Sequence, residues 1–257
     1  MQFIIISLTE ERKNKTKELL NIVNINNHPV HFITASTIEN SNDFLPQDSN
    51  LDENIMKIIC CTKSHLRSIE YACDESSPEY SIILEDDVTF HYNFNEMLEE
   101  LIIKWKSNNL YNNLSMMNIG WVPCNNFDHY NYSKIEPIDL LQSGKIFNYF
   151  YPVGLQGYII KKSKITEDIK YIISSDTFLE YSLKVFDKTP MLKEPNKPSN
   201  SIYAIDNVLN KLLNFVTIFP PIIIERNEPS TLGHDNKYYY WDNYFKNNEE
   251  KINNYIK

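Results

Sequence analysis

The feature that most constrains this chain is an uncharged, largely apolar run, Tyr80–Leu84, that ends abruptly at three consecutive carboxylates. The run has the length of a buried β-strand. The carboxylates of Glu85, Asp86 and Asp87 repel one another and are costly to remove from water, so a compensating group is expected beside them. A divalent cation is the simplest such group, since hard cations take oxygen ligands. A solvated acidic turn is the alternative. The position at a strand's C-terminal end favours the cation, because open α/β sheets bind ligands there.

The spacing of apolar residues predicts alternating strands and helices. The chain opens with a predicted strand over 3–8, a helix over 9–23 that Thr9 caps, and a strand over 29–34. Such a β-α-β opening is typical of a parallel sheet with crossover helices. Further helices are expected over 53–72, 94–105, 175–185 and 206–213, and further strands over 114–119, 157–160, 216–219 and 222–224. The segments 36–52 and 121–150 are expected to be loops. The predicted fold class is therefore α/β, with a mixed, mostly parallel sheet flanked by helices.

Composition limits the size of the fold and the kinds of ligand that the chain is expected to bind. The chain has 257 residues, of which 42 % are hydrophobic, enough for one large α/β domain. Its formal net charge is −9 with no basic stripe, which argues against a nucleic acid partner. Its 5 glycines form no phosphate-cradling loop, so a bound nucleotide would be held by carboxylates, a metal and other side chains.

The sequence also bears on the compartment. The apolar N-terminal run is short, lacks a basic leader and is followed by charged residues, so it is predicted to be a strand rather than a signal peptide. No run approaches the roughly 18 apolar residues of a transmembrane segment. The four cysteines form no CxxC pair, which predicts free thiols in the cytoplasm or another reducing compartment.

Four segments share a recognisable pattern, namely Ile83–Asp87, Cys61–Leu66, Ala204–Asp206 and the N-terminal strand followed by Arg12. Together they resemble glycosyltransferase family 25, which includes lipopolysaccharide-type galactosyltransferases and the collagen hydroxylysine galactosyltransferases. Ile83–Asp87 matches the family's I-L-E-D-D segment closely, and Cys61–Leu66 resembles its G-C-x-x-S-H-L segment, with Cys60 in place of the glycine. Ala204–Asp206 is similar to its P-x-D segment, with alanine in place of proline. The N-terminal strand followed by Arg12 looks like the family's opening, at a shorter spacing.

The resemblance implies a GT-A-type, Rossmann-like fold in a single domain over 1–235, followed by a tail over 236–257 for which a helix is one option. It further implies a metal-dependent, inverting glycosyltransferase that moves a hexose from a UDP-sugar, with galactose or glucose favoured. The acceptor would be a glycan or a hydroxylated side chain of a protein. Mn²⁺ or Mg²⁺ would hold the donor diphosphate, since a metal stabilises the anionic leaving group.

The resemblance also implies roles for individual residues. Asp87 is expected to be the principal metal ligand, with Glu85 and His234 beside it, and Asp206 is the expected catalytic base. The residues expected to contact the donor are Arg12, Ser64, His65, Glu85 and Asp86. Structural alternatives stand beside these roles. They are a surface salt bridge for Arg12, a helix cap for Asp206, a structural histidine for His65 and an exposed loop residue for His234.

Two other functions compete with a transferase. A non-catalytic member of the fold could bind a glycan or a partner without turnover, although Asp206 and His234 are both present. A nucleotidyltransferase is another metal-dependent option, and the lack of a glycine- and lysine-rich phosphate loop counts against it.

Overall fold

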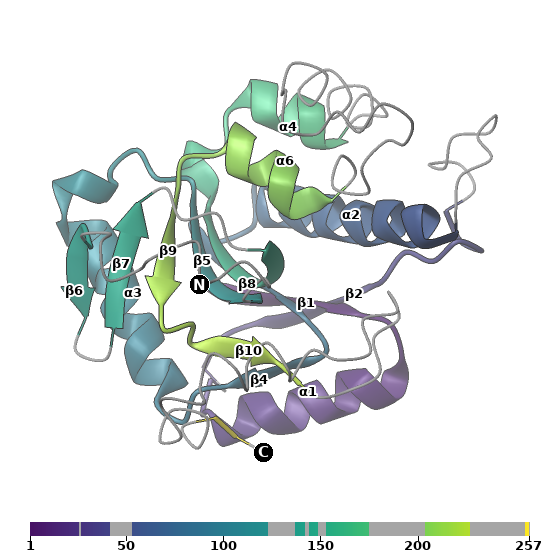
Figure 1. Cartoon of the computed structure of the whole chain (residues 1–257), viewed down its shortest axis with the longest axis horizontal. Helices are drawn as coiled ribbons and strands as arrows, with labels where there is room; N and C mark the ends of the chain where they lie inside the picture. Colours follow the sequence, from purple (N-terminus) through teal and green to yellow (C-terminus); the bar gives the residue numbers. More distant parts are fainter. Residues whose placement is uncertain are drawn as a thin grey trace, which may run out of the picture.

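The computed structural model describes residues 1–25, 27–41, 53–122, 137–141, 144–148, 153–174, 204–226 and 255–256. Within these ranges, ten strands form a single mixed sheet with helices on both faces (Figure 1). The strands are β1 (Gln2–Ser7), β2 (Val30–Thr34), β3 (Tyr80–Glu85), β4 (Val88–Phe90), β5 (Met116–Val122), β6 (Asp139–Leu141), β7 (Gly144–Asn148), β8 (Val153–Lys161), β9 (Phe215–Phe219) and β10 (Ile223–Glu225). The helices are α1 (Glu10–Ile22), α2 (Glu53–Ala72), α3 (Phe94–Ser107), α4 (Glu167–Ser174) and α6 (Ile205–Leu212).

Among the described residues the sheet has four parallel and five antiparallel strand pairs. This confirms the predicted mixed α/β class, but the sheet is not mostly parallel, as was expected. Its main path runs β2-β1-β3-β8-β5-β9-β7-β6. β1 is parallel to both β2 and β3, as the β-α-β opening predicts. β8 is inserted between β3 and β5 and is antiparallel to both. The carboxyl end of β3 therefore lies beside the amino-terminal half of β8, where Leu84 pairs with Gly157.

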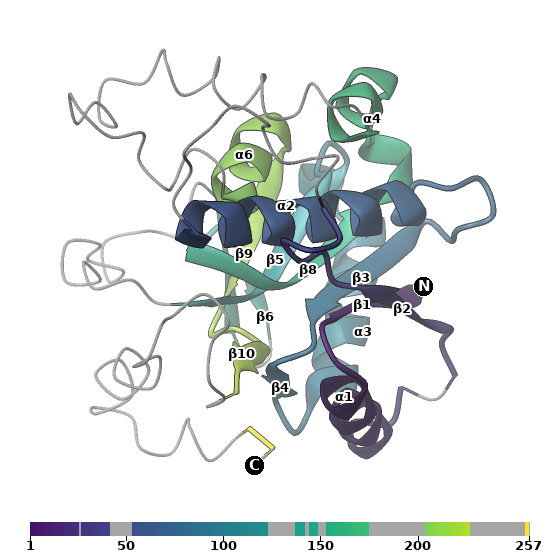
Figure 2. The same cartoon turned by 90° about the vertical axis from the view of Figure 1, so that its right-hand side faces the viewer.

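Each face of the sheet carries its own hydrophobic core. α1 and α3 cover one face and α2 and α6 cover the other, as two perpendicular views show (Figures 1 and 2). The alternation of strand side chains explains the division, since Ile82 and Leu84 pack in the first core and Ile83 in the second. Both faces of β3 are thus buried up to the residue at which the acidic triplet begins.

The structure adds elements that the sequence pattern did not predict. β4 follows the triplet directly and has only three residues, too few for a period to show. β6 and β7 pair inside the segment expected to be a loop over 121–150, and β5 extends into it as far as Val122. That expectation was therefore wrong for 121–122, 139–141 and 144–148. α4 was also missed, and the helix predicted over 175–185 lies outside the described residues.

The last described residues pack against the core of the domain. The Ile256 N–H donates to the Phe90 carbonyl at 3.0 Å, and the Thr89 hydroxyl donates to the Ile256 carbonyl at 2.6 Å. The rest of the predicted tail, 236–254 and 257, lies outside the described residues, and the boundary at 235 stays a prediction. None of the helices in the described ranges combines the length and hydropathy that a membrane span requires.

Candidate functional site

The acidic triplet lies at the carboxyl end of β3, where the chain turns into β4. Glu85 is the last residue of β3, and Asp86 and Asp87 form the turn before Val88. The three side chains are 24 %, 6 % and 13 % exposed respectively. A solvated acidic turn would show far greater exposure, so that alternative is wrong. The three carboxylates are expected to need compensation by the protein or by a ligand.

The Asp86 carboxylate is hydrogen-bonded on both oxygens by the N-terminal segment. The Ser7 hydroxyl and the Leu8 N–H donate to Oδ2 at 3.0 and 2.7 Å, and Arg12 Nη1 lies 3.4 Å from Oδ1. Asp86 therefore joins the end of β3 to the junction between β1 and α1. Its assignment to the donor site stays a prediction, and these contacts give it a structural role.

Two arginines, Arg12 and Arg226, contact the turn. Arg12 Nη1 lies 3.9 Å from Asp87 Oδ2, in addition to its contact with Asp86. Arg226, buried just after β10, donates from Nη2 to the Asp86 carbonyl and from its N–H to the Asp87 carbonyl at 2.6 Å. The salt bridges that Arg12 makes are thus with Asp86 and Asp87 of the triplet. The sequence pattern did not predict a role for Arg226, although its position two residues after the apolar run 221–224 could have indicated a sheet-edge residue.

Glu85 is held by a buried histidine and tyrosine. His65 Nε2 lies 3.2 Å from Glu85 Oε1, and His65 Nδ1 lies 3.1 Å from the Tyr158 hydroxyl oxygen. A carboxylate can only accept, so Nε2 carries the proton and the Tyr158 hydroxyl donates to Nδ1. Cys61 lies one helical turn before His65, with its Sγ 3.9 Å from the same Glu85 oxygen. Glu85, His65 and Tyr158 thus form one hydrogen-bonded chain.

Burial and the nearby negative charges raise the pKa values of two neighbouring neutral groups. Burial raises the pKa of the Cys61 thiol well above its usual value, and the charges of Glu85, Asp206 and Asp87 raise it further. Burial likewise raises the pKa of the Tyr158 hydroxyl well above its usual value, with added contributions from Glu85 and Cys61. Asp206 is therefore close enough for its field to reach the Cys61 thiol.

The raised pKa of Tyr158 predicts a loss of stability in alkali. The contribution is complete below the pKa of an unfolded tyrosine, about 10, and is lost as the pH rises towards the folded value. At about pH 11 the loss from this group reaches about 1.4 kcal/mol. Urea denaturation at about pH 8 and about pH 11 measures it, and Tyr158→Phe should reduce the difference by that amount. An identical pH dependence in the two proteins would contradict the assignment.

Asp206 lies in the first turn of α6, and its carboxylate contacts the start of β8. Its Oδ2 accepts the Gly154 N–H at 2.8 Å, while the N-cap position belongs to Ala204. Gly154 has a φ of 78°, in the left-handed region that favours glycine. The carboxylate thus anchors β8 and is favourably placed at the positive end of α6, without being its N-cap.

The structure brings most of the predicted site residues together. Arg12, His65, Glu85, Asp86 and Asp87 form one contiguous set. Ser64 does not join them, because its hydroxyl accepts the Ser36 N–H at 2.8 Å and donates to the Cys60 carbonyl at 2.9 Å. His234 lies outside the described residues. Ser7, Thr16, Cys61, Tyr158 and Arg226 contact the set and were not predicted to do so.

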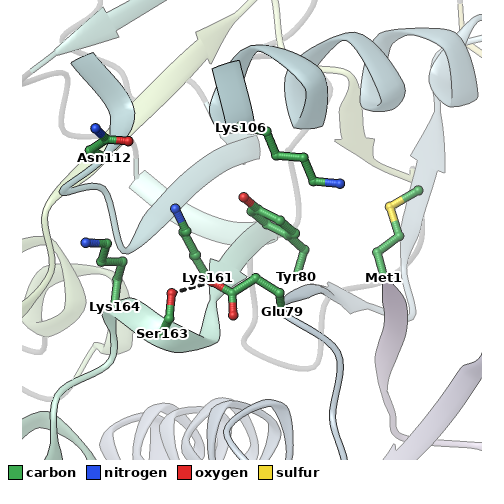
Figure 3. A pocket seen from close by; sticks show the side chains of 8 residues that line it. All are labelled: Met1, Glu79, Tyr80, Lys106, Asn112, Lys161, Ser163 and Lys164. Carbon is green, nitrogen blue, oxygen red and sulfur yellow. Dashed lines mark hydrogen bonds between the residues drawn. The ribbon is translucent and has the colours of Figure 1, made fainter. Parts of the chain in front are cut away.

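A hollow of about 770 Å³ lies at the other end of β3 (Figure 3). It is lined by Met1, Glu79, Tyr80, Lys106, Asn112, Lys161, Ser163 and Lys164. The ammonium groups of Lys106 and Lys161 lie 5.5 and 6.0 Å from the centroid of the Tyr80 ring. Because Tyr80 begins β3 and Glu85 ends it, this basic hollow is separate from the acidic triplet.

Comparison with known proteins gives a family for the chain. The model of Glycosyltransferase family 25 (LPS biosynthesis protein) matches residues 1–180. No curated protein matches. One similar solved structure is a glycosyltransferase involved in the glycosylation of the major capsid of PBCV-1, with 13 % identity, 90 % and 95 % of the two chains covered, and a TM-score of 0.41. Another is the galactosyltransferase LgtC in complex with donor and acceptor sugar analogues, with 11 % identity, 96 % and 83 % covered, and a TM-score of 0.40.

A third similar structure is that of mouse xyloside xylosyltransferase 1, with 11 % identity, 83 % and 70 % of the two chains covered, and a TM-score of 0.34. At these TM-scores the family assignment rests on the sequence match, which spans the acidic triplet and the His65 helix. The chain belongs to glycosyltransferase family 25.

Proposed function

We propose that the protein transfers a hexose from a UDP-sugar, with galactose or glucose favoured, to a hydroxyl group of a glycan or protein acceptor. The reaction is metal-dependent and inverting, on a GT-A-type scaffold. The observation that carries the proposal is the different environment of the three carboxylates in the triplet. Asp86 is bound on both oxygens by the protein, whereas Glu85 and Asp87 are the more exposed carboxylates at the sheet edge.

The donor set of this edge fits a hard divalent cation. Carboxylate oxygens are the ligands that Mn²⁺ and Mg²⁺ prefer, and Asp87 and Glu85 supply them at the carboxyl end of β3. Asp87 would hold the metal with support from Glu85, and His234 is proposed as a further ligand. A bound metal neutralises the charge that develops on the departing nucleoside diphosphate. Arg12, which is partly exposed, and the buried Arg226 keep the anionic turn in place.

The remaining roles belong to the side chains around the triplet. His65 holds the Glu85 carboxylate through Nε2, and Arg12 adds positive charge where the donor phosphates are proposed to bind. Asp206 is the proposed base, which takes the proton from the acceptor hydroxyl during a single displacement. Its burial and its proximity to the Cys61 thiol support this role. The free thiols of Cys60, Cys61 and Cys73 support action in a reducing compartment.

A panel of nucleotide sugars tests the proposal. Each donor is incubated with the full chain, with Mn²⁺ and with a chelator, and release of nucleoside diphosphate is measured. We expect the protein to turn over a UDP-hexose only when the metal is present. We also expect activity with only some of the donors in the panel. Binding of a glycan without turnover of any donor would identify the non-catalytic alternative. Turnover that is unchanged by the chelator would contradict the metal dependence.

A further inference from the structure

Cys61, His65 and Glu85 together form a cluster with a chemistry unlike that of the Asp87 carboxylate. Cys61 and His65 occupy successive turns on one face of α2, and Glu85 reaches them from the end of β3. The Cys61 sulfur, a His65 ring nitrogen and a Glu85 carboxylate oxygen all lie within 4.8 Å of one another. Glu85 Oε1 lies 3.2 Å from His65 Nε2 and 3.9 Å from Cys61 Sγ. The cluster presents one sulfur, one nitrogen and one oxygen to a common point.

These separations suit a small tetrahedral cation. With zinc bonds of about 2.0 to 2.3 Å, the ligand atoms of a tetrahedral site are about 3.4 to 3.8 Å apart. The cluster therefore needs only side-chain adjustments of about 1 Å or less to close on a zinc ion. A combination of thiolate, imidazole and carboxylate also favours Zn²⁺ over Mn²⁺ or Mg²⁺, which prefer all-oxygen sites.

We propose that Cys61 Sγ, His65 Nε2 and Glu85 Oε1 bind a Zn²⁺ ion, with a fourth position left for water or another ligand. The thiol proton is released to solvent on binding. The ion's two positive charges are balanced by the thiolate and the Glu85 carboxylate. The nearby charges of Asp87 and Asp206 add attraction for a cation at this point. This site shares the Glu85 carboxylate with the metal of the proposed transfer reaction, whereas its sulfur and nitrogen ligands, Cys61 and His65, are its own.

The Tyr158 hydroxyl can hydrogen-bond to His65 both without zinc and with zinc bound. Without zinc, the Tyr158 hydroxyl donates to His65 Nδ1, and Nε2–H donates to Glu85. When Nε2 binds zinc, the imidazole proton resides on Nδ1 and is donated to the Tyr158 oxygen over the same 3.1 Å contact. A hydroxyl can serve as donor or acceptor, so one buried partner orients the ring in both cases. This is the hydrogen bond that a metal-binding histidine ordinarily makes through its second nitrogen.

Cobalt substitution tests the zinc site in the full chain under reducing conditions. Co²⁺ bound by a thiolate absorbs in the near ultraviolet, and a four-coordinate Co²⁺ gives intense visible bands, so the spectrum reports both sulfur ligation and geometry. We expect both signals at one equivalent of Co²⁺ and their loss when Zn²⁺ is added. Absence of the thiolate band in the unaltered protein would overturn the proposal.

Variants assign the ligands. Cys61→Ser and Cys61→Ala should remove the thiolate band, and His65→Gln should weaken Co²⁺ binding by at least about 100-fold. Cys73→Ser is the matched control, since Cys73 is a second free thiol at the end of α2, and it should leave the spectrum unchanged. Circular dichroism shows which variants are folded. A thiolate band that persists in a folded Cys61 variant would place the sulfur ligand elsewhere and overturn the assignment.

The Asp87→Ala variant separates this site from the transfer reaction. We expect it to keep the cobalt–thiolate spectrum while losing Mn²⁺-dependent donor binding. A protein that binds Co²⁺ through Cys61 yet turns over no donor would retain the zinc site and refute only the proposed function. A protein that turns over a UDP-sugar but lacks the thiolate band would refute only the zinc site.

Discussion

Asp87→Ala should lower metal-dependent donor turnover by about 10³-fold and leave the protein folded. The carboxylate stands at the edge of the sheet, where it would hold the metal that faces the donor diphosphate. Its removal would cost roughly 4 kcal/mol of transition-state stabilisation, in the range measured when one preorganised electrostatic group is deleted. The measurement is the rate of nucleoside diphosphate release at saturating Mn²⁺, together with calorimetric titration of the donor.

The matched control for Asp87→Ala is Glu79→Gln. Glu79 precedes β3 at its opposite end and lines the basic hollow, so it is a carboxylate near the same strand but away from the site. We expect its donor affinity and turnover to equal those of the unaltered protein. Unchanged Mn²⁺-dependent binding in Asp87→Ala would remove this residue from the metal site and leave Glu85 as the remaining candidate within the triplet.

The second large effect is expected for stability, at the neighbouring residue. Asp86→Ala should lower the free energy of unfolding by about 3–5 kcal/mol, the usual cost of removing one partner from a buried ion pair. The substitution takes the acceptor from the Ser7 hydroxyl and the Leu8 N–H, and it leaves Arg12 beside Asp87 without its nearer carboxylate. Urea denaturation followed by circular dichroism measures the change.

Two further substitutions make the stability measurement specific. Asp86→Asn retains an acceptor oxygen and the side-chain volume, so it should destabilise the protein less than Asp86→Ala does. Glu10→Ala removes an exposed carboxylate from the first turn of α1 and should change stability by no more than about 1 kcal/mol. A loss below about 1 kcal/mol in Asp86→Ala would show that the contacts of its carboxylate contribute little to folding.

Much of the local structure could be predicted because its causes lie within a few residues. Thr9 caps α1 by accepting the Arg12 N–H, as the sequence pattern indicated. The uncharged run before the triplet is β3, buried on both faces, since apolar residues without charge satisfy two cores at once. β4 and the β6–β7 hairpin escaped prediction because they are short and are defined by pairing with distant strands.

The sequence by itself determined that three carboxylates end a buried strand and that a histidine helix precedes them. Without the family resemblance, the residues alone did not tell the three carboxylates apart, because adjacent acidic residues have nearly the same chemistry. Only the tertiary structure decided that Asp86 is bound within the protein, through Ser7 and Arg12, which lie 79 and 74 residues earlier in the chain. Only the tertiary structure likewise brings Arg226, 140 residues later, to the Asp86 carbonyl. It also places Cys61 and His65 beside Glu85. These contacts depend on which strands become neighbours in the sheet, and burial gives them their strength.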